Sequence, residues 1–237
     1  MAATQRIQRS TRDRHFYTWV AVVTAIIVLT GFAQSYYLKG LFDAPALSRL
    51  VHIHGIVMTV WFALFVVQSR LVAARRVDWH RRLGVFGAVW AAVVLVLGVT
   101  TAIVATRRDT VSNPEALKFL VVPLGDMLVF AVLITTALLF RRRIDTHKRL
   151  ILLSFVGLLA AAVARIPLNF IATGGPLAFF GLTDLFVLVC VAYDTVKNHR
   201  LHPAFGWGTL LIIVSQPLRL MLAETQVWMQ FARWITG

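Results

Sequence analysis

Five ionisable side chains lie inside long apolar stretches of this chain, each in a different stretch. They are two aspartates, two arginines and a histidine: Asp126, Asp184, Arg165, Arg219 and His54. An ionisable group in membrane hydrocarbon costs about 2.5–3.5 kcal/mol on insertion scales, so each one calls for a partner or a function. Counted at about 1.5 Å per residue from the nearest boundary, all five fall roughly 6–12 Å below the same membrane surface. The sequence therefore predicts a polar layer to which several helices contribute.

The residue types in this layer favour ion pairing, ligand binding or both. Aspartates and arginines at similar depth can neutralise one another, which is the cheapest way to keep charge in hydrocarbon. Such pairs could only lock the helices together, or they could line a site open to the outer face. In the second case His54 is the candidate haem ligand, and Arg165 and Arg219 would hold propionates or other anionic groups. Asp126 and Asp184 would then be proton carriers or ligands.

Imidazole and carboxylate groups also make a divalent metal a candidate for the same layer. His52 lies two residues before His54, and on a regular helix these side chains point about 200° apart. Both could therefore bind one ion only if the helix begins after His52 or is distorted there. The candidate metal ligands are His52, His54, Asp126 and Asp184. Polar residues that can join the rim of the layer are His52, Asn169, Gln216 and Glu224, whereas the inner half of the membrane is predicted to hold few charges.

A second set of histidines lies in basic loops between the apolar stretches. Residues 75–83 read RRVDWHRRL and residues 142–150 read RRIDTHKRL, and a fainter copy, HRL, follows at 199–201. The recurrence predicts a duplicated helical hairpin. In a structural interpretation Asp78 and Asp145 are helix N-caps and the histidines bond to neighbouring loops. In a functional one, His80, His147 and either His199 or His202 lie at the inner ends of alternate helices, where two could face each other across a haem, bind a metal or relay protons.

Composition and the lengths of the apolar stretches define the elements that must position these groups. Of the 237 residues, 59% are hydrophobic and 14% charged, and the mean hydropathy is +0.76, which excludes a water-soluble globule. Runs of roughly 20 apolar residues are long enough to cross a bilayer as helices. We expect an all-α polytopic membrane protein, a single domain over 1–237, with one N-terminal helix followed by repeated hairpins. The apolar runs predict seven membrane spans, at residues 17–38, 51–68, 83–106, 119–140, 150–166, 177–196 and 205–222.

Lysines and arginines predict the orientation of the chain. Most of the 24 fall in the tail 1–16 and in alternate loops, and positive residues in short loops stay on the cytoplasmic side. This places the N-terminus in the cytoplasm and the short segment 224–237 outside. The net charge of +14 is then an insertion signal and not evidence of nucleic-acid binding. The single cysteine, Cys190, excludes a disulfide framework.

Two resemblances follow from these motifs. The segment from His54 to Met58, within a membrane helix, resembles the H-G-x-x-M segment that carries a haem-ligating histidine in haem-copper oxidases and some b-type membrane cytochromes. Over its length, the chain resembles a group of small bacterial multi-pass membrane proteins marked by an H-x-H-G helix and an H-R-R-L-G loop, here residues 52–55 and 80–84. This second resemblance implies a fold and a bacterial inner-membrane location, and it leaves the activity open.

The sequence leads to two functional hypotheses. In the first, the polar site near the outer face binds haem b, a divalent metal or a quinone and supports electron transfer. In the second, the protein is a small transporter, or a membrane sensor or assembly factor, without a redox cofactor, whose ion pairs exchange partners between two conformations. The expected partners are the lipid bilayer, a small-molecule or quinone ligand, and a second copy or a larger membrane complex.

Overall fold

The computed structural model describes residues 2–43, 45–110, 113 and 115–237, with the backbone alone described for 2–14. The predicted basic tail 1–16 therefore lies largely outside the described side chains. Every element in the described part is a helix, and none is a strand. The elements are α1 (Ala2–Gly31), η1 (Ala33–Tyr37), η2 (Lys39–Leu41), α2 (Arg49–Ala73), α3 (Val77–Asp109), α4 (Ala116–Phe119), α5 (Val121–Leu139), α6 (Ile144–Val156), η3 (Gly157–Leu159), α7 (Ala160–Val163), α8 (Asn169–Asn198), α9 (Pro203–Ala223) and α10 (Gln226–Thr236).

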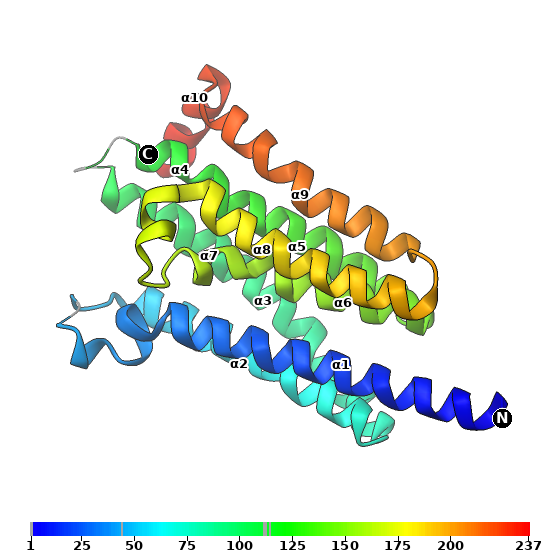
Figure 1. Cartoon of the computed structure of the whole chain (residues 1–237). Helices are drawn as coiled ribbons and strands as arrows, with labels where there is room; N and C mark the ends of the chain where they lie inside the picture. Colours follow the sequence, from blue (N-terminus) through cyan, green and yellow to red (C-terminus); the bar gives the residue numbers. More distant parts are fainter. Residues whose placement is uncertain (1, 44, 111–112, 114) are drawn as a thin grey trace.

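The long helices lie side by side as an up-and-down bundle (Figure 1). Within the described residues, six helical stretches are long and apolar enough to cross a membrane, and the apolar part of α1, His15–Gly31, is shorter. The prediction of an all-α polytopic membrane protein is thus confirmed, while the seventh span stays a prediction. The six stretches are Arg49–Ala73, Val77–Asp109, Ala116–Leu139, Ile144–Val163, Asn169–Asn198 and Pro203–Ala223.

The two ends of the bundle differ in their loops. One end, called here the basic-loop end, holds the N-terminus and the connections 74–76, 140–143 and 199–202. The C-terminus lies at the opposite end, with α4 and α10 (Figure 1). Each basic connection is short, so α2 with α3, α5 with α6, and α8 with α9 form antiparallel hairpins.

Local signals set several helix boundaries, although not all those expected. Ser48 caps α2 by accepting a hydrogen bond from the Val51 N–H at 3.4 Å. The prediction that Asp78 and Asp145 are N-caps is wrong, because α3 and α6 begin one residue before each aspartate. Both aspartates instead lie in the first helical turn, where a negative charge interacts favourably with the helix dipole.

Aromatic packing joins the first hairpin to the second. The Phe155 ring of α6 stacks on two α2 rings, with centroids 4.5 Å from Trp61 and 4.2 Å from Phe65. Trp61 also meets Phe130 of α5 edge-on at 5.5 Å. These rings are buried, and aromatic pairs of this geometry contribute beyond the area they bury. The contacts hold α2 and α5 in fixed positions relative to each other.

Helix irregularities concentrate toward the end opposite the basic loops. In α8 the backbone leaves helical geometry at Gly175, which has φ +52° and ψ −137° and precedes Pro176. A positive φ of this kind suits glycine, because a Cβ would strain it. The α9 helix contains Pro217, which cannot donate to the preceding turn. Both interrupted helices carry residues of the predicted polar layer.

Candidate functional site

An ion pair between α5 and α9 forms the centre of the polar layer. Arg219 donates through Nη1 to Asp126 Oδ1, and the two side chains are only 8% and 11% exposed. The same guanidinium donates to Ser215 Oγ at 2.8 Å and to the Val122 carbonyl at 3.4 Å. Gly125 makes room for the arginine stem, because a Cβ there would lie 2.3 Å from Arg219 Cδ. The predicted pairing of an aspartate with an arginine is present here.

The second aspartate of the layer joins this pair through α9. The Gln216 amide, one turn before Arg219, donates to Asp184 Oδ1 at 2.8 Å. The Arg219 guanidinium also lies 5.9 Å from the Phe180 ring, which precedes Asp184 by one turn of α8. Through Gln216 and Arg219, α9 is bound both to α5 and to α8, although no hydrogen bond among the described residues joins the two contacts. We call this set of polar contacts the α5–α8–α9 network, made of Asp126, Asp184, Ser215, Gln216 and Arg219.

His54 and Arg165 form a separate group. Arg165 donates to the Ala161 carbonyl at 2.6 Å and lies 4.9 Å from the Phe32 ring. It is close enough to act electrostatically on His54, which is half-buried on α2. Within the part of the chain that the structure describes, the buried His54 Nδ1 has no hydrogen-bond partner. Among the described residues, no hydrogen bond or ion pair links this group to the α5–α8–α9 network, so direct contacts do not unite the five groups of the layer.

The candidate metal ligands are not gathered in one place. His52 is exposed, and its carbonyl accepts a hydrogen bond from the Tyr36 hydroxyl at 3.2 Å. Asp126 and Asp184 are held by Arg219 and Gln216. In the part of the chain that the structure describes, no group of three or more His, Cys, Asp or Glu side chains is placed to hold a metal ion. The metal hypothesis thus gains no geometric support.

His80 and His147, the two histidines of the repeated loops, lie at contacts between the two helices of their hairpins. His147 Nδ1 lies 2.8 Å from the Ala137 carbonyl of α5. With the Gln68 amide oriented to satisfy both of its groups, it donates to the His80 carbonyl at 3.2 Å and accepts from the Gly84 N–H at 3.0 Å. Each repeated histidine thus lies where the second helix of a hairpin contacts the first. These contacts favour the structural interpretation of the repeated loop.

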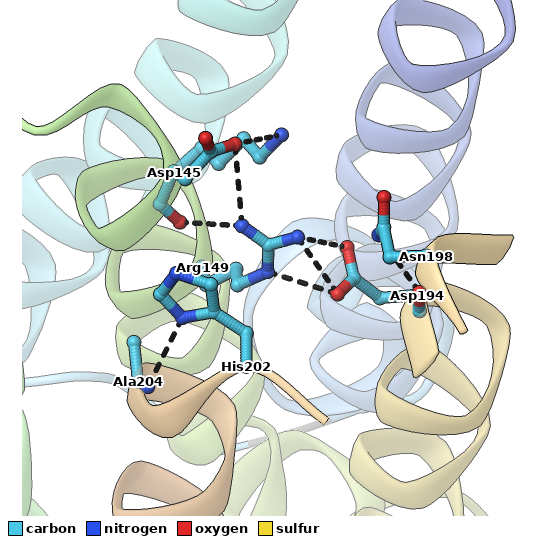
Figure 2. Close-up of polar contacts among 7 residues, drawn as sticks. Asp145, Arg149, Asp194, Asn198, His202 and Ala204 are labelled. Carbon is cyan, nitrogen blue, oxygen red and sulfur yellow. Dashed lines mark hydrogen bonds and ion pairs between the residues drawn. The ribbon is translucent and has the colours of Figure 1, made fainter. Parts of the chain in front are cut away.

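The basic-loop end contains a buried ion pair that sequence reasoning missed (Figure 2). Arg149 of α6 donates through Nε and Nη2 to the two carboxylate oxygens of Asp194 on α8, both at 2.9 Å. These side chains are only 3% and 4% exposed. Arg149 Nη1 also donates to the Asp145 carbonyl at 2.7 Å. The expectation that this half is poor in charge is therefore wrong.

A polar cavity of about 250 Å³ lies beside this ion pair. The residues that line it are Asp145, Arg149, Asn198, Arg200 and His202. His202 caps α9 by accepting the Ala204 N–H on Nδ1 at 3.1 Å (Figure 2). Burial, followed by the nearby Arg149 cation, lowers the pKa of His202 below its usual 6.5. Because Nδ1 accepts a hydrogen bond, the capping geometry requires the neutral ring with its proton on Nε2.

The fold and the two ionic clusters define a polytopic α-helical membrane protein with buried polar groups in both halves. No protein-family model, no curated protein and no solved structure matches this chain significantly.

Proposed function

We propose that this protein is a proton-coupled membrane carrier for a small polar solute, and that the α5–α8–α9 network is its coupling site. The observation that carries the proposal is that two nearby carboxylates have partners of different charge. Asp126 is paired with the Arg219 cation, whereas Asp184 is held by the neutral Gln216 amide. Arg219 and Gln216 lie one turn apart on α9, so a movement of α9 that brings Arg219 to Asp184 would exchange one carboxylate for the other.

Proton uptake supplies a physical reason for that exchange. When Asp126 accepts a proton on its carboxylate, its attraction for Arg219 falls. The arginine is then left with the Ser215 hydroxyl and the Val122 carbonyl, which leave its charge uncompensated. Asp184, or an acidic group of a solute, becomes the favourable partner. Release of the proton restores the first pair.

The interrupted helices support movement at this site. Carriers commonly place their sites at breaks in membrane helices, where the backbone is irregular only because it lines a cavity. Pro217 lies between Gln216 and Arg219, and Gly175 breaks α8 before Asp184. Pro217 is thus adjacent to the α9 residues that would exchange partners, whereas the break at Gly175 lies about 13 Å along α8 from Asp184.

The Asp184→Asn variant gives the cleanest test. Its amide oxygen still accepts from Gln216, so the fold is expected to persist, while the ionisable group is lost. Proteoliposomes loaded with the pH-sensitive dye pyranine are challenged with a panel of small carboxylic acids, amino acids and inorganic phosphate. We expect at least one solute to drive proton movement that Asp184→Asn abolishes.

Asp43→Asn is the matched control, because Asp43 is exposed in an outer loop and lies in no network. It should transport like the wild type. Equal rates in the wild type, Asp184→Asn and empty liposomes across the panel would refute the carrier proposal.

Electron transfer at His54 is the second candidate, and one observation favours it. Among the described residues the buried His54 Nδ1 has no partner, and the Arg165 cation lies near enough to His54 to pair with a haem propionate or to donate to a quinone carbonyl. The test is an absorption spectrum of the purified protein, oxidised and then reduced with dithionite. A haem Soret band that disappears in His54→Ala would support this candidate, and a colourless protein obtained in full yield would remove haem.

We also propose that the basic-loop end faces the cytoplasm of a bacterial inner membrane, with His15–Gly31 as a seventh span. The arginine-rich connections and the N-terminus share that end, as the positive-inside rule requires. The shared placement of His80 and His147 in their hairpins supports the proposed duplication. Alkaline phosphatase fused after Gly237 should be active and green fluorescent protein dark, and the reverse result would invert the orientation.

A further inference from the structure

The cavity at the basic-loop end takes no part in the proposed carrier site. From His202 to Arg219 the distance along α9 is about 25 Å, at 1.5 Å per residue. No residue of the α5–α8–α9 network lines the cavity. An inference about its ligand is therefore independent of the carrier proposal.

The deepest residue of the cavity is fixed by its own contacts. Arg149 uses Nε and Nη2 on Asp194 and Nη1 on the Asp145 carbonyl. The ion pair is bidentate and buried, so its geometry is rigid. The Arg149 guanidinium thus gives one side of the cavity a positive charge in a fixed position.

Two other donors at the cavity have no partner within the described residues. Because His202 Nδ1 accepts the Ala204 N–H, the ring proton of the neutral imidazole lies on Nε2, which is free to donate. Arg200 lines the cavity from the exposed α8–α9 connection, and none of the described contacts uses its guanidinium. The cavity therefore offers hydrogen-bond donors from two side chains beside the fixed arginine.

The charge around the cavity favours an anion. Its one lining carboxylate, Asp145, is already held by Lys148 Nζ at 2.9 Å and lies 3.4 Å from Arg149 Nη1. The other nearby carboxylate, Asp194, is bound on both oxygens by Arg149. Among the described residues, Arg200 is then the lining cation that no carboxylate contacts.

We propose that this cavity binds a phosphate group. A tetrahedral anion can accept hydrogen bonds from several directions at once, as the donors of Arg200 and His202 beside Arg149 require. The cavity lies where α8 ends and α9 begins, at the end of two candidate membrane spans. That position is accessible both to free phosphate from the aqueous side and to the headgroup of a phospholipid.

The test uses the full-length protein in a maltoside detergent, with thermal unfolding followed by tryptophan fluorescence. One arm titrates inorganic phosphate against sodium chloride at equal ionic strength. The other dopes the micelles with phosphatidylglycerol or with diacylglycerol, which lacks the phosphate. A ligand that binds the folded protein raises its unfolding midpoint in a saturable manner.

The variants remove the donors while keeping the fold. Arg200→Gln removes the exposed cation, and His202→Asn removes the Nε2–H but keeps an oxygen that can cap α9. Each should weaken binding by about tenfold or more, the effect of losing one hydrogen bond to a charged group. Arg142→Gln is the control, since Arg142 is an exposed basic-loop cation that does not line the cavity.

The two arms identify the source of the phosphate. A saturable shift with inorganic phosphate that both variants weaken identifies a soluble ligand. A shift produced only by phosphatidylglycerol and weakened in the same variants identifies a lipid headgroup. No saturable shift in either arm, or equal shifts in Arg200→Gln, His202→Asn and Arg142→Gln, overturns the proposal.

Discussion

Removal of one carboxylate from the α5–α8–α9 network should destabilise the protein more than removal of the whole ion pair. In Asp126→Asn the side-chain oxygen can still accept from Arg219, but the charge that compensates the buried guanidinium is lost. The remaining partners, Ser215 Oγ at 2.8 Å and the Val122 carbonyl at 3.4 Å, are neutral. Breaking a buried pair in this way costs about 3–5 kcal/mol of folding free energy.

The double variant Asp126→Leu, Arg219→Met separates stability from function. Replacing a buried ion pair by apolar residues of similar size is often neutral or stabilising. Ser215 keeps a partner in this variant, since its hydroxyl also donates to the Ile212 carbonyl at 2.8 Å. We expect its stability to lie within about 1 kcal/mol of the wild type, or above it, while proton-coupled transport is abolished.

Reversible unfolding by sodium dodecyl sulfate in bicelles, followed by tryptophan fluorescence, would measure both free energies. Asp43→Asn serves as the exposed control and should change stability by less than about 0.5 kcal/mol. The argument for a desolvated pair fails if Asp126→Asn costs less than about 1 kcal/mol, or if the double variant is as unstable as the single one.

Three further predictions concern other parts of the bundle. Gly31→Ala should lower the free energy of unfolding by about 1–3 kcal/mol, because the new Cβ would lie 2.1 Å from a backbone oxygen of α7. Gly87→Ala should be neutral or stabilising, because nothing lies within 4 Å of its new Cβ, and thermal unfolding of both variants tests the difference. The pKa of His202 is lowered in the folded state, so its stabilising contribution is complete above about pH 6.5 and is lost as the pH falls below that value. The unfolding midpoint, measured between pH 5 and 8, should therefore depend less steeply on pH in His202→Asn than in the wild type. Asp194→Asn should lower the free energy of unfolding by about 3–5 kcal/mol, because the Asp194 side chain is buried. Asp145→Asn should lower it by less than about 1 kcal/mol, because the Asp145 side chain is 71% exposed, although both aspartates contact Arg149. Equal losses would contradict the importance of burial.

The sequence predicted the membrane helices well because the main requirement for crossing a bilayer is an apolar run of about 20 residues, which can be read directly from the sequence. It also predicted that Asp126 and Arg219 lie at similar depth, and that Gln216 belongs to the layer, since position along a helix follows from its rise per residue. The direction in which each side chain points did not follow. A membrane helix is apolar on its lipid-facing and protein-facing sides alike, so no periodic pattern distinguishes them. Depth thus suggested that His54 shares the site of Asp126, whereas the two belong to separate groups.

The missed pair at the basic-loop end has a related cause. Arg149 stands in a loop motif in which arginines are common, and Asp194 lies near the end of its apolar stretch. Each residue was compatible with exposure at a membrane boundary, where a charge costs little. Only the approach of α6 and α8, set by packing between distant segments, buries both residues.

The two ionic clusters hold α8 and α9 differently at the basic-loop end and further along the helices. At the basic-loop end, α8 is bound to α6 by the bidentate pair of Arg149 and Asp194, which fixes both distance and orientation. About 15 Å further along α8 at 1.5 Å per residue, between Asp194 and the irregular backbone at Gly175, single side-chain hydrogen bonds join Gln216 to Asp184 and Arg219 to Asp126. A hairpin fixed by two parallel bonds at one end and by single, exchangeable bonds further along moves most readily as a lever about the fixed end. In the carrier proposal, the buried pair at the basic-loop end is therefore the pivot, and proton uptake acts at the exchangeable contacts, which lie far from the pivot and move most.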